Sequence, residues 1–119
     1  MKRYTMIALT NAKPGRDAEM VAWYNDVHLA QVLELPSVVS AQFSIVADIP
    51  SAGKPQWRYA GIYAIEGDDP APVFDEMMRR YISQEMTPSD AMDDISYNGI
   101  FEDGPVLNTQ APLSVKKEA

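Results

Sequence analysis

The sequence predicts an α+β fold in which two helices cover one face of a four-stranded antiparallel sheet. Three observations lead to this prediction. Segments with the two-residue alternation of strands and segments with the period of amphipathic helices follow one another in the order β-α-β-β-α-β. The length of 119 residues suits one domain. Hydrophobic residues make up 46% of the chain, which is an ordinary fraction for a protein with a packed core.

A strand and then a helix are predicted at the start of the chain. Residues 4–10 (YTMIALT) are rich in β-branched and aromatic residues and are followed by a turn with proline and glycine. The helix begins near Asp17, an acid suited to a first turn, and ends near His28. Its apolar stripe consists of Met20, Val21, Trp23, Tyr24 and Val27. Residues 29–35 are also largely apolar and are predicted to form a second short helical piece, which ends at Pro36.

Two strands follow, separated by a loop over residues 48–55. Residues 38–47 alternate cleanly, and residues 57–66 have the pattern of the next strand. In the first of these strands, one face is expected to hold Val39, Ala41, Phe43 and Ile45, and the other Ser40, Gln42 and Ser44. In the second, one face is expected to hold Trp57, Tyr59, Gly61, Tyr63 and Ile65.

A second helix and a last strand complete the predicted domain. The helix has Pro72 in its first turn, where proline is tolerated, and ends near Glu85. Residues 94–101 (DISYNGIF) are the last strand. Residues 1–101 are therefore expected to form one ferredoxin-like domain, in which two β-α-β halves share a single sheet. Residues 102–119 are expected to be a tail that packs on a partner subunit.

The composition excludes several classes of function. The chain carries 17 acidic and 10 basic residues, for a net charge of −7, and no basic patch that could neutralise a series of phosphates, so we expect no nucleic-acid partner. The absence of cysteine excludes disulfides, thiolate catalysis and cysteine-bound metals. No apolar run approaches the roughly 20 residues of a membrane helix. We therefore expect a cytoplasmic protein that does not bind membranes.

One face of the predicted sheet lacks a cover. The helices occupy one face, and the other is expected to carry bulky side chains, with Trp57, Tyr59 and Tyr63 as candidates. An exposed aromatic surface of this kind is typical of an interaction site. Two such sheets packed face to face would enclose a barrel with a cavity. The sequence therefore predicts a homodimer.

Several motifs resemble EthD-like members of the dimeric α/β-barrel superfamily. They are Gly15-Arg16 before the first helix, the pattern Trp-Tyr-x-x-x-His-Leu at residues 23–29, Leu35-Pro36, and the strand over residues 38–43. The resemblance covers roughly residues 1–101. One position departs from it, because relatives commonly carry proline two residues after the histidine and this chain has Ala30 there.

The resemblance implies a homodimeric α/β barrel whose cavity accepts a small apolar or aromatic molecule. The superfamily includes cofactor-free monooxygenases, muconolactone isomerases, polyketide cyclases, heme-degrading enzymes and dye-decolourising peroxidases. A fold shared by so many reactions does not decide between them, so the function has to be argued from the site.

His28 is the only histidine of the chain and the first candidate for catalysis. On a helix it shares the apolar face with Tyr24, whereas Trp23 is expected to lie off that face. With an ordinary pKa of about 6.5, His28 can give or take a proton near neutral pH, and Tyr24 can orient it or donate to a substrate oxygen. The alternative is that His28 hydrogen-bonds a backbone carbonyl and holds the helix-to-strand connection. A single histidine lacks the ligand spacing of a metal site, so we expect neither a metal nor a cofactor.

Side chains of the strands are the candidates for substrate binding, namely Tyr59, Tyr63, Tyr97, Gln42 and Ser40. Gly61 lies between two of the tyrosines, and its missing side chain leaves room for a ligand above the sheet. Tyr97 is expected across from them if the third and fourth strands are neighbours. The phenol hydroxyls can donate hydrogen bonds to an enolate or phenolate. In the alternative, these tyrosines form the core of the dimer.

These residues favour a small-molecule enzyme of aromatic or polyketide-type metabolism. In this hypothesis a cavity histidine transfers a proton during an isomerase, cyclase, lyase or cofactor-free oxygenase reaction. A second hypothesis is a non-catalytic dimeric ligand-binding or auxiliary protein. A third is a barrel filled by its own aromatic side chains, which would exclude both of the others.

Overall fold

The computed structural model describes residues 2–108 of the chain. Its elements are β1 (Lys2–Thr10), α1 (Asp17–Trp23), η1 (Tyr24–His28), α2 (Leu29–Leu33), β2 (Val38–Ile45), η2 (Pro50–Ala52), β3 (Tyr59–Gly67), α3 (Ala71–Ile82) and β4 (Tyr97–Glu102). Because α1, η1 and α2 follow one another without a break, they form one continuous helix, here called the first helix. The predicted β-α-β-β-α-β order is observed.

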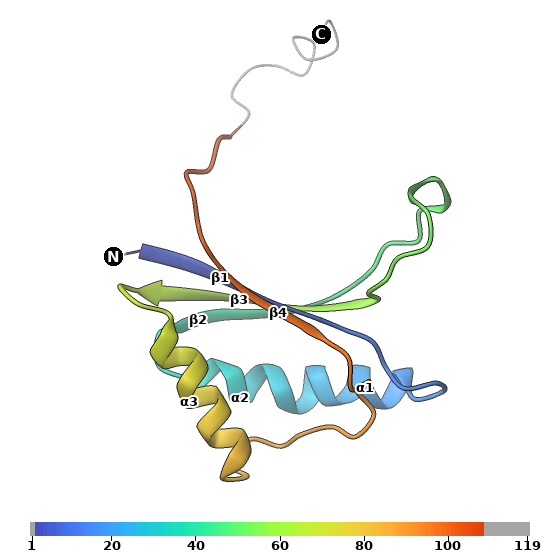
Figure 1. The fold of residues 1–119 in the computed structure, drawn as a ribbon, viewed down its shortest axis with the longest axis horizontal. Helices are drawn as coiled ribbons and strands as arrows, with labels where there is room; N and C mark the ends of the chain where they lie inside the picture. The colour runs from blue at the N-terminus through green and yellow to red at the C-terminus, as the bar shows by residue number, and fades with distance from the viewer. Residues whose placement is uncertain (1, 109–119) are drawn as a thin grey trace, which may run out of the picture.

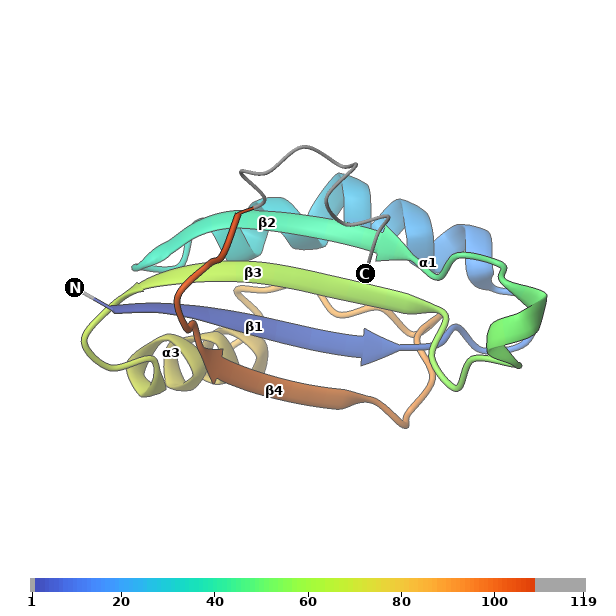
Figure 2. The same cartoon turned by 90° about the horizontal axis from the view of Figure 1, so that it is seen from above.

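The four strands form one antiparallel sheet in the order β2-β3-β1-β4. β1 and β3 occupy the middle and pair along their whole length, with Lys2 opposite Gly67 and Thr10 opposite Tyr59. The first helix and α3 lie together on one face of this sheet, as Figures 1 and 2 show. The prediction of an α+β fold with a four-stranded antiparallel sheet and two helices on one face is confirmed.

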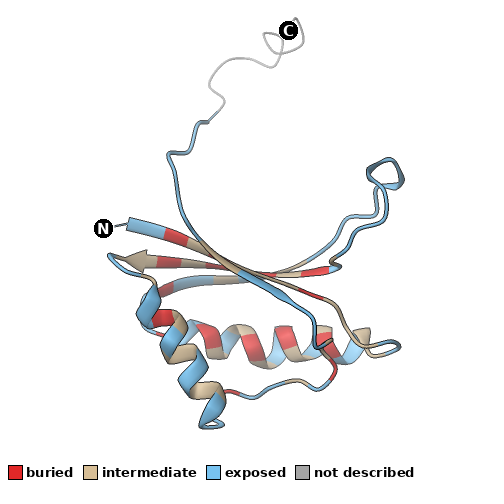
Figure 3. Ribbon diagram, in the orientation of Figure 1, coloured by how far each residue is buried: buried red, intermediate tan, exposed pale blue. Residues whose placement is uncertain are grey.

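The core lies between the sheet and the helices (Figure 3). Its larger group of buried side chains comprises Tyr4, Met6, Val32, Leu35, Val38, Tyr63, Ile65, Val73 and Met86. A second group comprises Met20, Tyr24, Tyr59 and Ala91. Within the strands and helices, the buried residues recur at the alternate and the three-or-four-residue spacings of one face. These are the periods from which the elements were predicted.

The first helix does not end at His28, because the second helical piece that was predicted over residues 29–35 is observed as α2 and continues it without a break to Leu33. Val32, four residues beyond His28, is fully buried, so the same helix face goes on packing against the sheet. Ala30 offers a backbone N–H where a proline would interrupt the helix. Within the helix, η1 is a π-helical turn, in which the Leu29 N–H bonds the carbonyl of Tyr24.

The second predicted helix also ends at a different residue. α3 stops at Ile82 rather than Glu85, because Gln84 adopts a left-handed backbone conformation with φ 65°. The amides of Glu85 and Met86 then bond back to the carbonyl of Arg80, which completes a helix-ending turn.

The strand boundaries differ from the prediction by a few residues. β1 starts at Lys2, β2 stops at Ile45, β3 starts at Tyr59, and β4 spans Tyr97–Glu102. β4 thus extends one residue into the predicted tail. Residues 103–108 form no regular element, and the rest of the predicted tail, residues 109–119, lies outside the described residues.

The faces of β2 and β3 also depart from the prediction. A bulge between Val38 and Ser40 turns Val38 toward the helices and leaves Val39 47% exposed. Contrary to the prediction, Tyr59 and Tyr63 are buried on the helix-covered face and not on the uncovered one. The reason is that large aromatic groups gain most from burial, and the core lies under the helices.

The uncovered face of the sheet, here called the open face, carries apolar side chains mixed with small polar ones. Alternation and register place on it Thr5, Ile7, Leu9, Ser40, Gln42, Ser44, Ala60, Ile62, Ala64, Tyr97 and Phe101. The β2–β3 connection and residues 103–108 both rise on this side of the sheet (Figure 1). None of the helices in the described part of the chain is long and apolar enough to cross a membrane.

Candidate functional site

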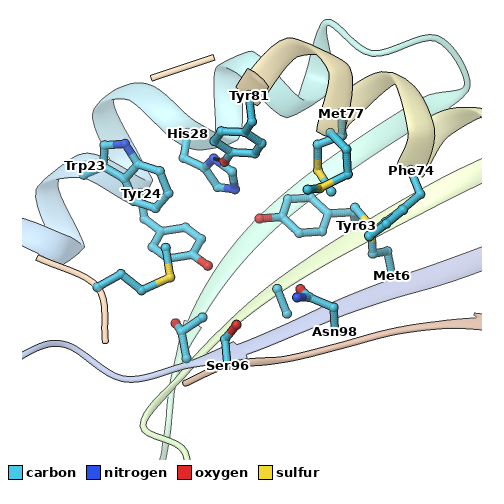
Figure 4. A pocket seen from close by; sticks show the side chains of 14 residues that line it. Met6, Trp23, Tyr24, His28, Tyr63, Phe74, Met77, Tyr81, Ser96 and Asn98 are labelled. Carbon is cyan, nitrogen blue, oxygen red and sulfur yellow. Dashed lines mark hydrogen bonds between the residues drawn. The ribbon is translucent and has the colours of Figure 1, made fainter. Parts of the chain in front are cut away.

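A cavity of about 240 Å³ lies between the sheet and the helices. It is lined by Met6, Ala8, Thr10, Trp23, Tyr24, His28, Tyr63, Phe74, Met77, Met78, Tyr81, Met92, Ser96 and Asn98 (Figure 4). Its size is slightly below the roughly 300–1,000 Å³ that is usual for sites of drug-sized ligands, so it suits a molecule of one or two rings. All of these residues come from one chain, so the cavity exists without a partner subunit.

The π-helical turn positions His28 at this cavity. In a regular α-helix, side chains five residues apart point about 140° away from each other. The wider turn at η1 brings Trp23 and His28 onto the same face, where their rings stack with centroids 4.4 Å apart. The Trp23 Nε1–H donates to the carbonyl of Thr87 at 2.9 Å, which holds the indole in place. The expectation that Trp23 lies off the face of His28 is therefore wrong.

His28 is buried and electrically neutral. Its side chain is 6% exposed, and burial lowers its pKa from 6.5 to about 4. Its Nδ1 lies 3.0 Å from the hydroxyl of Tyr81 on α3, rather than against the backbone carbonyl that the structural alternative expects. Nε2 has no hydrogen-bond partner among the described residues. At neutral pH, His28 is thus a weak base with one ring nitrogen available to a ligand.

The hydroxyl groups of Tyr24, Tyr63 and Thr10 belong to side chains that line the same cavity as His28. Figure 4 shows the side chains of Tyr24, Tyr63 and His28 pointing toward one another. The Tyr63 hydroxyl and the Thr10 hydroxyl are buried and have no partner among the described residues. Burial raises the pKa of Tyr24 and of Tyr63, so both phenols keep their protons at neutral pH. We call the group His28, Tyr24, Tyr63 and Thr10 the polar end of the cavity.

The rest of the cavity wall is largely apolar and adaptable. Its apolar side chains include Met6, Phe74, Met77, Met78 and Met92. Methionine is flexible and polarisable, so such a wall accommodates flat ring systems of varied outline. None of the described lining residues is Lys, Arg, Asp or Glu, and burying a charged group without a counter-charge is costly. The cavity therefore favours a neutral ligand.

The residues predicted for the site fall into two sets. His28, Tyr24 and Tyr63 line the cavity. Tyr59 does not, because its ring stacks with Phe43 and its hydroxyl donates to Asp17. The room expected above Gly61 is filled, since a side chain added there would overlap the hydroxyl of Tyr63.

The other three predicted residues lie on the open face. Tyr97 is 47% exposed there, and β1 separates its strand from β3, so it does not lie across from Tyr63. Gln42 and Ser40 are exposed on the same face, away from the cavity. These three side chains therefore lie away from His28 and its cavity.

Sequence reasoning did not identify Thr10, Tyr81, Ser96 or Asn98 as site residues. Tyr81 belongs to the apolar stripe of α3, and a stripe of this kind reads as core packing. Its hydroxyl meets His28 across 53 positions of sequence, which no local pattern reports. Within the described residues, no group of three or more His, Asp or Glu side chains is arranged to hold a metal ion.

The comparisons with known proteins support the fold. No family model matches the chain, and no curated protein does so either. Among solved structures, the chain is similar to a protein from Shewanella loihica PV-4 whose crystal structure is described as that of "a putative monooxygenase". The TM-score is 0.58 at 13% identity, and the match covers 91% of this chain and 97% of that one. At this identity the likeness shows a shared fold.

Proposed function

We propose that this chain is a small-molecule enzyme that binds a neutral aromatic or polyketide-like ring compound and acts at a carbon beside its carbonyl or phenol oxygen. The observation that carries the proposal is the convergence of His28, Tyr24 and Tyr63 in a cavity whose described lining is largely apolar and carries no charged side chain. Isomerisation, cyclisation, lyase chemistry and cofactor-free oxygenation all pass through an enol or enolate of such a compound. A site that binds this oxygen serves each of them.

The proposed catalytic groups are His28 and Tyr24, with Tyr63 as a binding group. The ligand oxygen lies at the polar end, where the hydroxyls and the free His28 nitrogen can hydrogen-bond it. Because the pKa of His28 is about 4, it is a poor base for removing a proton from carbon. His28 therefore acts at the ligand oxygen, where it shares a proton with the developing enol.

We also propose that the subunit is ferredoxin-like and pairs through its open face into a homodimeric α/β barrel of the EthD-like kind. Support comes from the apolar residues of that face, such as Ile7, Ile62 and Phe101. The β2–β3 connection and residues 103–108 rise beyond the same face, where they can clasp a second sheet (Figure 1). The fold similarity to the protein described as "a putative monooxygenase", which extends over 91% of this chain, is compatible with this arrangement.

A ligand-binding protein without catalytic activity is the second candidate. The low pKa of His28 favours it, because a neutral buried histidine can serve binding alone. The two candidates differ in turnover and not in affinity, so an assay has to measure both.

Exchange of the α-protons of 2-tetralone separates these candidates. This neutral two-ring ketone has acidic protons beside its carbonyl, and their replacement in D₂O is followed by proton NMR. An enzyme accelerates the exchange, and His28→Phe, which keeps a ring but removes both nitrogens, abolishes the acceleration. Asp26→Ala, an exposed position on the same helix, is the matched control and leaves the rate unchanged. Saturable binding without exchange would favour the ligand-binding protein, and neither binding nor exchange would refute both.

A further inference from the structure

The hydrogen bond between Tyr81 and His28 links α3 to the first helix beside the cavity. It joins two side chains of the cavity wall that come from different helices. A neutral imidazole carries its proton on one nitrogen and accepts on the other. The direction of this bond therefore determines whether the imidazole proton is on Nδ1 or on Nε2, and so whether Nε2 can donate a hydrogen bond to a ligand.

Two arrangements of the bond are possible. In the first, the Tyr81 hydroxyl donates to Nδ1, and the imidazole proton is on Nε2. In the second, Nδ1–H donates to the phenol oxygen, and the phenol proton needs another acceptor. No other group among the described residues hydrogen-bonds the Tyr81 hydroxyl. The first arrangement satisfies the Tyr81 hydroxyl and His28 Nδ1 and leaves Nε2–H for a ligand, and it also pairs the more acidic donor with the more basic acceptor.

The surroundings of His28 keep its ring neutral and in one orientation. Trp23 stacks on one face of the imidazole, and the ring of Tyr24 meets it edge-on with centroids 5.1 Å apart. Tyr63 approaches from the sheet, with centroids 6.2 Å apart. None of these neighbours carries a charge, and burial raises the pKa of Tyr81, so the phenol proton stays on Tyr81. Nε2 is the part of the ring left for a ligand.

We propose that Tyr81 is a positioning residue that fixes His28 as the Nε2–H tautomer, so that His28 donates a hydrogen bond to a ketone or enolate oxygen. This inference rests on the proposed function for the identity of the ligand. When an α-proton leaves the ligand for solvent, the electron pair of the broken C–H bond moves onto the oxygen. A neutral imidazole N–H, aided by the Tyr63 hydroxyl, then stabilises that negative charge.

The sole histidine makes the tautomer directly observable. A long-range ¹H–¹⁵N correlation spectrum of ¹⁵N-labelled protein at pH 7.5 contains one imidazole, so it needs no assignment. We expect a protonated Nε2 and an unprotonated Nδ1 in the wild-type protein. In Tyr81→Phe, the Nδ1 resonance should move away from its hydrogen-bonded position. Tyr97→Phe removes an exposed hydroxyl on the open face and is the control that leaves the spectrum unchanged.

Ligand preference supplies a second readout that a purely structural role of Tyr81 would not change. 2-Tetralone only accepts hydrogen bonds, whereas tetralin has the same rings and no oxygen. Tyr81→Phe should weaken 2-tetralone binding roughly twofold to tenfold and leave tetralin affinity unchanged. Equal losses for both compounds would show a packing role and overturn the inference.

The spectrum and the binding assay can fail separately. A wild-type spectrum with the proton on Nδ1 would overturn the inference whatever the protein binds. A wild-type Nε2–H signal with no binding of either compound would contradict the proposed function and leave the tautomer assignment standing.

Discussion

The indole of Trp23 stacks on the imidazole of His28 with ring planes 19° apart, although the two residues are five positions apart in one helix. Only a π-helical turn places such a pair on one face, and this turn occurs where the helix borders the cavity. Turns of this type are frequent at functional sites. Trp23 is therefore both a support for His28 and part of the cavity wall.

Tryptophan fluorescence should report binding in the cavity. The chain has two tryptophans, and Trp57 lies outside the cavity lining, so Trp57→Phe leaves Trp23 as the sole reporter. We expect 2-tetralone to quench the fluorescence of this variant along a saturable curve, because the ketone binds against the indole. Trp23→Phe should show only the linear quenching of a random collision. Saturation in the second variant would place the ligand elsewhere.

The stability of the protein should fall between pH 6.5 and pH 4 because of His28. Its pKa is about 4 in the folded chain and 6.5 when unfolded, so the unfolded state binds the proton first as the pH drops. The contribution is fully present above pH 6.5 and is lost as the pH falls through this window, for a total of about 3 kcal/mol.

His28→Phe isolates this contribution, because the chain has no other histidine. Chemical denaturation of both proteins across the window should show the additional slope in the wild type alone. Acidic groups such as Glu76, whose pKa Arg79 holds at about 2, affect both proteins equally. Parallel stability curves would mean that His28 titrates normally.

Tyr63→Phe should separate function from stability. The Tyr63 hydroxyl is buried without a partner among the described residues, and an unpaired buried hydroxyl costs about 1–3 kcal/mol. Its removal should therefore leave the free energy of unfolding unchanged or raise it, while 2-tetralone binding weakens. Denaturant titration and a binding isotherm measure the two effects. A clear loss of stability would show that the hydroxyl serves the core.

A methyl group at Gly61 should disturb the site through Tyr63. A Cβ there would overlap the Tyr63 hydroxyl, and that side chain is 1% exposed, so the ring must shift from its packed position beside the cavity. Gly61→Ala should destabilise the fold by about 1–3 kcal/mol and weaken ligand binding. In the matched control, Gly99→Ala, the nearest atom is the hydroxyl of the exposed Tyr97, which can move aside. Equal effects of the two changes would contradict this role of Gly61.

A charge on the open face should dissociate the proposed homodimer. Phe101 is 49% exposed on that face, and Phe101→Lys places an unpaired cation in the interface. Leu33→Lys is the control, because Leu33 is 46% exposed on the first helix, on the other side of the sheet. Light scattering should give a dimer for the wild type and the control and a monomer for Phe101→Lys. A monomeric wild type would refute the pairing.

The fold was predictable from the sequence because alternation and helical periodicity are local. The same reasoning paired Tyr24 with His28, since residues four apart share a helix face. Strand alternation also predicts that Tyr59 and Tyr63 share a face of β3, but it does not predict which face of the sheet the helices cover. That choice depends on how the sheet and helices pack together.

The rest of the site depends on contacts that no local pattern contains. The π-helical turn that brings Trp23 to His28 changes the helical period at one point, and the apolar stripe does not reveal it. Tyr81 reaches His28 from a different helix, and Thr10 comes from the end of β1. The lowered pKa of His28 follows from these surroundings, so an ordinary value was the natural expectation from sequence.

The most direct test of the account is a crystal structure of the protein with 2-tetralone bound. The account predicts the rings among Met6, Phe74 and Met77, with the carbonyl oxygen within hydrogen-bond distance of His28 Nε2 and the Tyr63 hydroxyl. A ligand bound only on the open face, or a carbonyl turned away from His28 inside the cavity, would contradict it.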